Sequence, residues 1–160
     1  MGAIRQSGVV VAEKQRHTAE LDLLVPFTTP ELTRAALDAA NRMGAGLNAV
    51  IRLVKVQVVP YPLDLKQSPV YIEFLKDQLA HFQSDIPVAP EIRLARDLEA
   101  GLLGTLGGES VVILATRKRP WKTSNERLAA ALRRAGRTVV LAALDPSAAA
   151  SRVTREVSHA

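Results

Sequence analysis

Two short apolar runs with a helical pattern between them stand out in the last third of the chain. Residues 111–115 are continuously apolar and too short for a buried helix, which is typical of a strand covered on both faces in a parallel sheet. A stripe at helical spacing follows: Leu128, Ala131, Leu132 and Ala135. Residues 138–144 then form a second apolar run. This pattern predicts a right-handed strand-helix-strand crossover, whose first loop lies at the carboxyl edge of the sheet, where such folds bind ligands.

Local signals predict where that helix begins and ends. Thr123 precedes Glu126 by three positions, the spacing at which a hydroxyl and a carboxylate cap the first helical turn reciprocally. Gly136 can adopt the left-handed conformation that commonly ends a helix. We therefore expect the helix to start near Ser124 and to stop before Gly136.

The first half of the chain repeats the alternation of strand and helix. Residues 21–25 predict a core strand, and Thr29-Pro30-Glu31 predicts a helix start with a capping hydroxyl and an N1 proline. That helix should reach about Met43 with one small-residue face: Leu32, Ala36, Ala39 and Met43. Residues 47–59 are rich in valine and isoleucine and predict a long strand containing a bulge.

Prolines mark the next two elements. Ser68-Pro69 predicts a second helix that ends near Ser84 and has one apolar face: Ile72, Leu75, Leu79 and Phe82. Residues 91–95 predict an edge strand, because Pro87 and Pro90 cannot donate ladder hydrogen bonds. Asp97 then caps a glycine-interrupted helix. The glycines of that region precede a strand and lack Gly-Lys-Ser/Thr, so they do not predict a phosphate loop.

Composition narrows the functional classes. The 160 residues suit one domain, and the absence of cysteine agrees with a reducing compartment, for which we expect the cytoplasm. No apolar run reaches the length of a membrane span. The three histidines, His17, His81 and His159, lack metal-ligand spacing, and no serine elbow or carboxylate pair suggests catalysis. We expect neither a metal site nor an enzyme.

Charge raises a second possibility. The net charge is +5, and much of the excess lies between Arg117 and Arg137, opposed only by Glu126. A solvated face and a site for phosphate or an acidic partner both explain this run. The 4% aromatic content argues against stacking platforms for single-stranded nucleic acid, so nucleic acid is not the expected partner. Trp121 is expected to pack under Arg117 or Arg119, with base stacking as the alternative.

The order of elements resembles the universal stress protein family over about residues 20–144. Five stretches carry the resemblance: residues 23–26, 32–46, 111–115, 123–128 and 135–140. The family implies an α/β, three-layer fold with an open five-stranded parallel sheet of order 3-2-1-4-5, like that of adenine nucleotide alpha hydrolases. We expect one domain (19–145) of this type, with an N-terminal arm (1–18) and a C-terminal tail (146–160) outside the resemblance. In this order the ends of strands one and four lie side by side at the switch point.

The motif that ATP-binding members share is largely replaced here. Residues 27–29 stand where the family has Asp-Gly-Ser, Ala115 and Lys118 stand where it has its first two glycines, and Lys122-Thr123 replaces Gly-Ser. Three residues instead of nine separate Lys118 from Lys122. The loop can still form an anion site at the helix start. The candidate nucleotide or anion site comprises Thr28, Thr29, Thr116, Arg117, Lys118, Lys122, Thr123 and Ser124.

The resemblance and the missing catalytic groups together lead to a functional expectation. We expect a non-enzymatic stress-response or regulatory domain that acts through protein partners and needs no cofactor. Two alternatives stay open, an ATP-binding switch of the same family and a basic nucleic-acid-binding module. Family members commonly pair through the last strand, whose apolar edge needs cover, so we expect a homodimer. Its interface would comprise Val139, Val140, Leu141, Ala142, Ala143 and Leu144.

Overall fold

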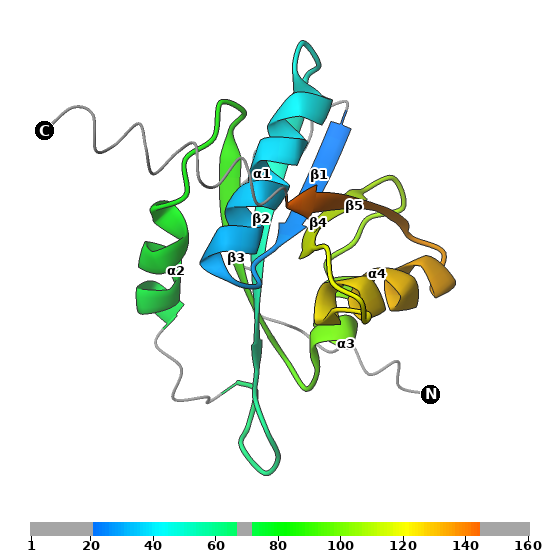
Figure 1. Ribbon diagram of the computed structural model, residues 1–160. Helices are drawn as coiled ribbons and strands as arrows, with labels where there is room; N and C mark the ends of the chain where they lie inside the picture. Colours follow the sequence, from blue (N-terminus) through cyan, green and yellow to red (C-terminus); the bar gives the residue numbers. More distant parts are fainter. Residues whose placement is uncertain (1–20, 67–71, 145–160) are drawn as a thin grey trace, which may run out of the picture.

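The computed structural model describes residues 21–66 and 72–144. Three expectations lie outside the described residues: the arm at 1–18, the helix start at Ser68-Pro69 and the tail at 146–160. Within the described part, strands and helices alternate along the chain as predicted. Figure 1 shows the resulting sheet with helices on both of its faces.

All five strands are parallel and follow the order β3-β2-β1-β4-β5, as predicted. The strands are β1 (Leu21–Pro26), β2 (Ala49–Val58), β3 (Val88–Ala95), β4 (Val111–Arg117) and β5 (Thr138–Leu144). Strands β1 and β4 are central, whereas β3 and β5 form the edges. Strands β2 and β3 are added on one side of β1, and β4 and β5 are added on the other. The carboxyl ends of β1 and β4 therefore flank the switch point.

Four helices cover the sheet in two layers (Figure 1). They are α1 (Pro30–Gly44), α2 (Ile72–Ala80), α3 (Leu98–Leu103) and α4 (Ser124–Arg134). Helices α1 and α2 pack on one face, where Leu37 and Leu79 are buried against the strands. Helices α3 and α4 pack on the other, where Leu102 and Leu132 are buried. The fold is therefore a three-layer α/β sandwich.

The predicted caps hold at the start of three helices. Thr29 Oγ1 accepts a hydrogen bond from Leu32 N, and Pro30 occupies the first turn of α1. Asp97 Oδ1 accepts from Ala100 N at 2.7 Å at the start of α3. Thr123 and Glu126 form the complete capping box of α4. The starts of these helices could be predicted from the sequence, because capping depends on neighbouring residues alone.

Two details differ from the sequence prediction. Strand β2 pairs with β3 without interruption from Ile51 to Val58, so the predicted bulge is wrong. Helices cover both faces of this strand, and a regular pleat already buries both sets of side chains. The stripe of α4 is also shifted: Ala135 is exposed because it caps the helix, and the buried positions are Asn125, Leu128, Ala129 and Leu132.

A buried ion cluster lies under the α3/α4 layer in the amino half of the sheet. Arg52 on β2 is only 4% exposed and forms two hydrogen bonds to the Asp22 carboxylate, at 2.9 and 2.8 Å. Its remaining donors reach Thr105 O at 2.9 Å and Ser110 Oγ at 3.2 Å, and Glu91 lies 3.5 Å away. The guanidinium thereby ties β1, β2 and β3 to the loop between α3 and β4.

None of the helices in residues 21–66 and 72–144 is long and apolar enough to cross a membrane.

Candidate functional site

A cavity of about 660 Å³ opens at the carboxyl edge of the sheet, at the switch point between β1 and β4. Its volume lies within the range of roughly 300–1,000 Å³ that is usual for small-molecule sites. Six segments supply its wall: the loop after β1, the first turn of α1, the end of β2, the start of α3, the end of β4 with the loop after it, and the start of α4. The lining residues are Phe27, Thr28, Thr29, Leu32, Lys55, Val56, Gln57, Val58, Leu98, Thr116, Arg117, Arg119, Thr123, Ser124 and Asn125.

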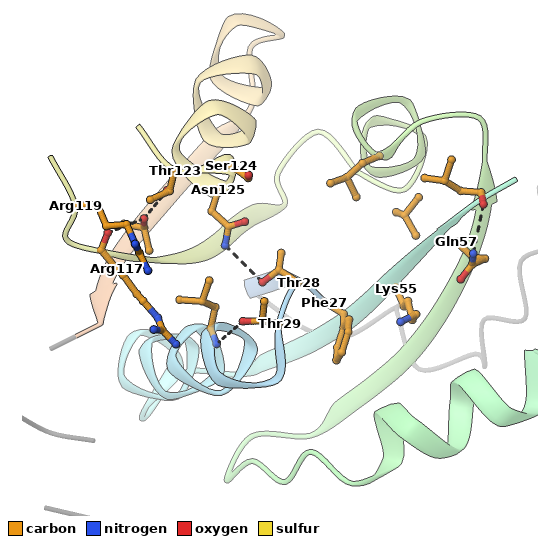
Figure 2. A pocket seen from close by; sticks show the side chains of 15 residues that line it. Phe27, Thr28, Thr29, Lys55, Gln57, Arg117, Arg119, Thr123, Ser124 and Asn125 are labelled. Atoms are coloured by element: carbon orange, nitrogen blue, oxygen red, sulfur yellow. Dashed lines mark hydrogen bonds between the residues drawn. The ribbon is translucent and has the colours of Figure 1, made fainter. Parts of the chain in front are cut away.

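Asn125, at the start of α4, links the loop after β1 to strand β4. Its side chain is buried, and Nδ2 donates to Ala115 O at 2.7 Å and to Thr28 Oγ1 at 3.5 Å. The backbone N of Thr28 donates to Thr33 Oγ1 at 3.1 Å, which anchors the same loop to α1. The loop after β1 is therefore fixed to α1 on one side and to α4 on the other, as Figure 2 shows for Thr28 and Asn125.

The hydroxyl groups at the start of α4 are already bonded to each other and to the helix. Thr116 Oγ1 and Thr123 Oγ1 lie 2.7 Å apart, and Thr123 Oγ1 also accepts from Glu126 N at 3.3 Å. Thr123 N donates to the Glu126 carboxylate at 2.6 Å. The Glu126 carboxylate thus already accepts a hydrogen bond from one of the backbone amides that an anion at this helix start would need.

Three cationic side chains line the cavity, and none of its described lining residues is acidic. Arg117 forms an ion pair with Glu31 of α1, in which both side chains are about half exposed. Arg119 lies with its guanidinium carbon 5.8 Å from the ring centre of Trp121. Lys55 Nζ lies 4.3 Å from the ring centre of Phe27. The cavity is therefore electropositive, and Arg119 and Lys55 make no ion pair with any described residue.

The cavity has two chemically different ends. Figure 2 shows Arg117 and Arg119 beside Thr123 at one end, and Phe27, Lys55 and Gln57 at the other. Apolar side chains from β2 and α3 complete the second end: Val56, Val58 and Leu98. A ligand with an anionic group and a flat apolar part matches this arrangement.

The structure brings together six of the eight residues predicted for the site. Thr28, Thr29, Thr116, Arg117, Thr123 and Ser124 line the cavity, whereas Lys118 and Lys122 are exposed and do not line it. Trp121 is 62% exposed, so it does not pack against the core, but Arg119 lies over its ring as one form of the expectation had it. The short loop carries this ring away from the core, because Pro120 and the cap at Thr123 fix its two sides.

Four polar lining residues were missed in the sequence: Lys55, Gln57, Arg119 and Asn125. The polar residues of β2 alternate with valines near its end, and this signal marks side chains that leave the core as the strand approaches the ligand-binding edge. Asn125 carried no such signal, because an asparagine in the first helical turn usually serves the helix.

The arrangement can bind an anion, and the described lining contains no histidine, aspartate or glutamate side chain. Among residues 21–66 and 72–144, no group of three histidine, aspartate or glutamate side chains could hold a metal ion. Comparison of the chain with protein-family models and with curated proteins finds no match.

Proposed function

We propose that this chain is a non-enzymatic regulatory domain of the universal stress type, which acts through protein partners and carries a weak anion site at the carboxyl edge of its sheet. The cavity at the switch point is the observation that carries the proposal. It lies where the expected sheet order places a ligand site, and its wall is electropositive. The protein partner, the stress response and the cytoplasmic location belong to this proposal through the resemblance in sequence.

The contacts of the cavity argue for low affinity. Arg117 is shared with Glu31, and the Thr123 amide is shared with Glu126, so an anion has to compete with two carboxylates. The remaining donors sit in an open site, where each charge-assisted hydrogen bond contributes about 1.5–3 kcal/mol before the cost of ordering. We expect phosphate and ATP to bind with dissociation constants nearer millimolar than micromolar.

Isothermal titration calorimetry with phosphate, AMP and ATP tests this expectation. Arg119→Ala should weaken binding of all three ligands about tenfold, the loss expected for one charge-assisted bond. Arg134→Ala is the matched control, because Arg134 is exposed in the last turn of α4, away from the cavity. A submicromolar dissociation constant for ATP that Thr123→Ala abolishes would contradict the weak site.

An ATP-binding switch is the second candidate, and the apolar end of the cavity favours it. Phe27, Val56 and Leu98 offer surfaces on which a base can lie, beside the ammonium group of Lys55. If this candidate is correct, ATP should bind at least tenfold more tightly than triphosphate alone, because the base adds apolar contact. Equal affinity for ATP and triphosphate would support the simple anion site instead.

A further inference from the structure

We propose that the carboxyl edge of the sheet binds a short single strand of nucleic acid, whose bases stack on aromatic rings that are each paired with a cation. The chain contains one tryptophan, two tyrosines and three phenylalanines. One residue of each type lies at this edge: Trp121, Tyr61 and Phe27. The aromatic content of the chain is low, but these three rings lie at the same edge of the sheet.

Tyr61 and Arg96 form the first pair. Tyr61 follows β2 and is 79% exposed, and the guanidinium carbon of Arg96, which follows β3, lies 3.9 Å from its ring centre. Arg96 NH1 also donates to Val59 O at 3.0 Å. That hydrogen bond fixes the guanidinium in place, so the exposed ring and its cation are held together without a ligand.

Trp121 and Arg119 form the second pair, on the loop after β4. Trp121 exposes 62% of its surface, an unusual state for the largest apolar side chain. Lys118, Lys122 and Arg127 are exposed near it in the sequence, and no carboxylate of the described residues forms an ion pair with any of them. The segment that carries the ring therefore also carries exposed positive charges that suit a phosphate backbone.

Phe27 and Lys55 form the third pair, which lies in the cavity between the other two. Phe27 is only partly exposed, because it packs against the core and its ring meets the edge of Phe82. Because the strands are parallel, the loops after β1, β2, β3 and β4 all emerge at the same edge. Two acidic side chains of these loops are engaged locally: Asp64 accepts from Lys66 N, and Asp97 caps α3. The edge thus carries three cation-aromatic pairs along a mainly basic surface.

The spacing fits a strand of a few nucleotides. Arg96 follows β3 and Arg119 follows β4, and three strand spacings of about 4.8 Å separate these positions, or roughly 14 Å. One strand of a duplex rises about 3.4 Å per nucleotide, and a single strand stacked on protein rings is more extended, so this distance covers at most roughly four nucleotides. Alternation of exposed rings with cations is the arrangement by which proteins hold single strands without reading sequence.

A membrane surface fits the same features less well. Membrane binding needs a continuous apolar face beside a basic one, whereas the three rings here are separated by a cavity with hydroxyl, amide and cationic groups. Tyr61, Arg96 and Trp121 lie outside the cavity lining, so their part in strand binding can be tested apart from the small-ligand site.

The single tryptophan makes the test direct. Fluorescence anisotropy of the full chain with a labelled oligothymidylate of about eight nucleotides measures the affinity, and quenching of Trp121 emission reports stacking. We expect quenching, tighter binding than to polyphosphate of equal charge, and an affinity that falls with added salt. Trp121→Ala and Tyr61→Ala should each weaken binding about fivefold or more, while Trp121→Phe should retain most of it.

Loss of one positive charge at the carboxyl edge is tested with Arg119→Ala in the same oligonucleotide assay. Arg42→Ala is its matched control, because Arg42 is exposed in the last turn of α1, at the opposite edge of the sheet. Equal binding of polyphosphate and oligothymidylate, unchanged in both aromatic variants, would overturn the proposal. So would a chain that binds AMP as tightly as the oligonucleotide, a result that leaves the small-ligand site intact. Sedimentation with anionic vesicles, without oligonucleotide binding, would assign the edge to a membrane surface and overturn it too.

Discussion

Arg52 is the residue whose environment differs most from what its sequence position indicates. In the alternating pattern of β2 it reads as one polar residue among valines, yet it is only 4% exposed and bonds to Asp22, Ser110 and Thr105 O. A buried guanidinium persists because each of its donors finds an acceptor. Those acceptors lie 30 to 58 positions away in the sequence, so local pattern could not reveal them.

Arg52→Ala should therefore lower the free energy of unfolding by about 3–5 kcal/mol, because it leaves the buried carboxylate of Glu91 and the partly exposed carboxylate of Asp22 without this cation. Urea denaturation followed by circular dichroism measures the loss. Arg134→Ala, at an exposed position of α4, should change it by less than about 0.5 kcal/mol. A loss below about 1 kcal/mol for Arg52→Ala would mean that water replaces the guanidinium without cost.

The same cluster defines a pH dependence. Burial alone would lower the pKa of Arg52, but the hydrogen bond and charge of Asp22 and the charge of Glu91 outweigh burial and raise it above its ordinary value. A raised folded-state pKa gives stability that is lost only as pH rises through it, so the contribution is complete below about pH 12. The loss caused by Arg52→Ala should consequently be equal at about pH 7 and about pH 9.

Glu31 affects the cavity through Arg117, with which it forms a half-exposed ion pair. Glu31→Gln should release the guanidinium for a ligand and strengthen phosphate binding by up to about fivefold, since exposed pairs contribute roughly 0–1 kcal/mol. Calorimetry with phosphate measures the change. Glu73→Gln breaks the comparable exposed pair with Lys76 on α2 and should leave the affinity unaltered. Weaker binding in Glu31→Gln would mean that the ion pair orders Arg117 for the ligand.

At the level of elements, α3 lies close to the sheet because it carries a glycine. A Cβ at Gly101 would meet Val56 Cγ1 at 2.6 Å and the Ala95 side chain at 3.0 Å. Gly101 therefore lets the short helix approach β2 and β3 closely. This packing role explains why a glycine stands at position 101, in a glycine-rich region that does not form a phosphate loop.

Gly101→Ala should destabilise the protein by about 1–3 kcal/mol through overpacking, although alanine by itself favours a helix by roughly 1 kcal/mol. Gly108→Ala is the matched control, because a Cβ there meets nothing within 4 Å. Thermal unfolding of both variants measures the cost of the added methyl group at the packed position against its cost at the open one. A more stable Gly101→Ala would show that Val56 moves aside at little cost.

Elements were predictable from sequence wherever their signals are local. The Thr123 and Glu126 box, the proline at the start of α1 and the left-handed Gly136 lie within a few residues of the boundaries that they set. The sheet order followed from the family resemblance rather than from periodicity. Side-chain partners across the cavity were not predictable, because Asn125 and Thr28 are 97 positions apart and meet only in the folded chain.

The whole molecule places the buried ion cluster and the cavity at opposite ends of the strands. The buried cluster around Arg52 fixes the amino half of the sheet, and the cavity and exposed rings occupy the carboxyl edge. A rigid scaffold with function in its loops is the general arrangement of open α/β sheets. Substitutions in the amino half should accordingly change stability, whereas substitutions in the carboxyl-edge loops should change binding.

Strand β5 lies at the edge of the sheet and pairs with β4 alone among the described strands. Val140, Leu141 and Ala142 are only partly buried, and Ala143 is exposed, which leaves an apolar edge able to pair with another chain. We predict that two copies associate through β5. Sedimentation velocity at micromolar concentration should give a dimer, and Ala143→Lys should shift it to a monomer, because a charge on an edge strand opposes pairing. Leu47→Lys, also an exposed apolar position but outside β5, should leave the dimer intact. A monomer for the unmodified chain would show that the edge is covered from within the same molecule.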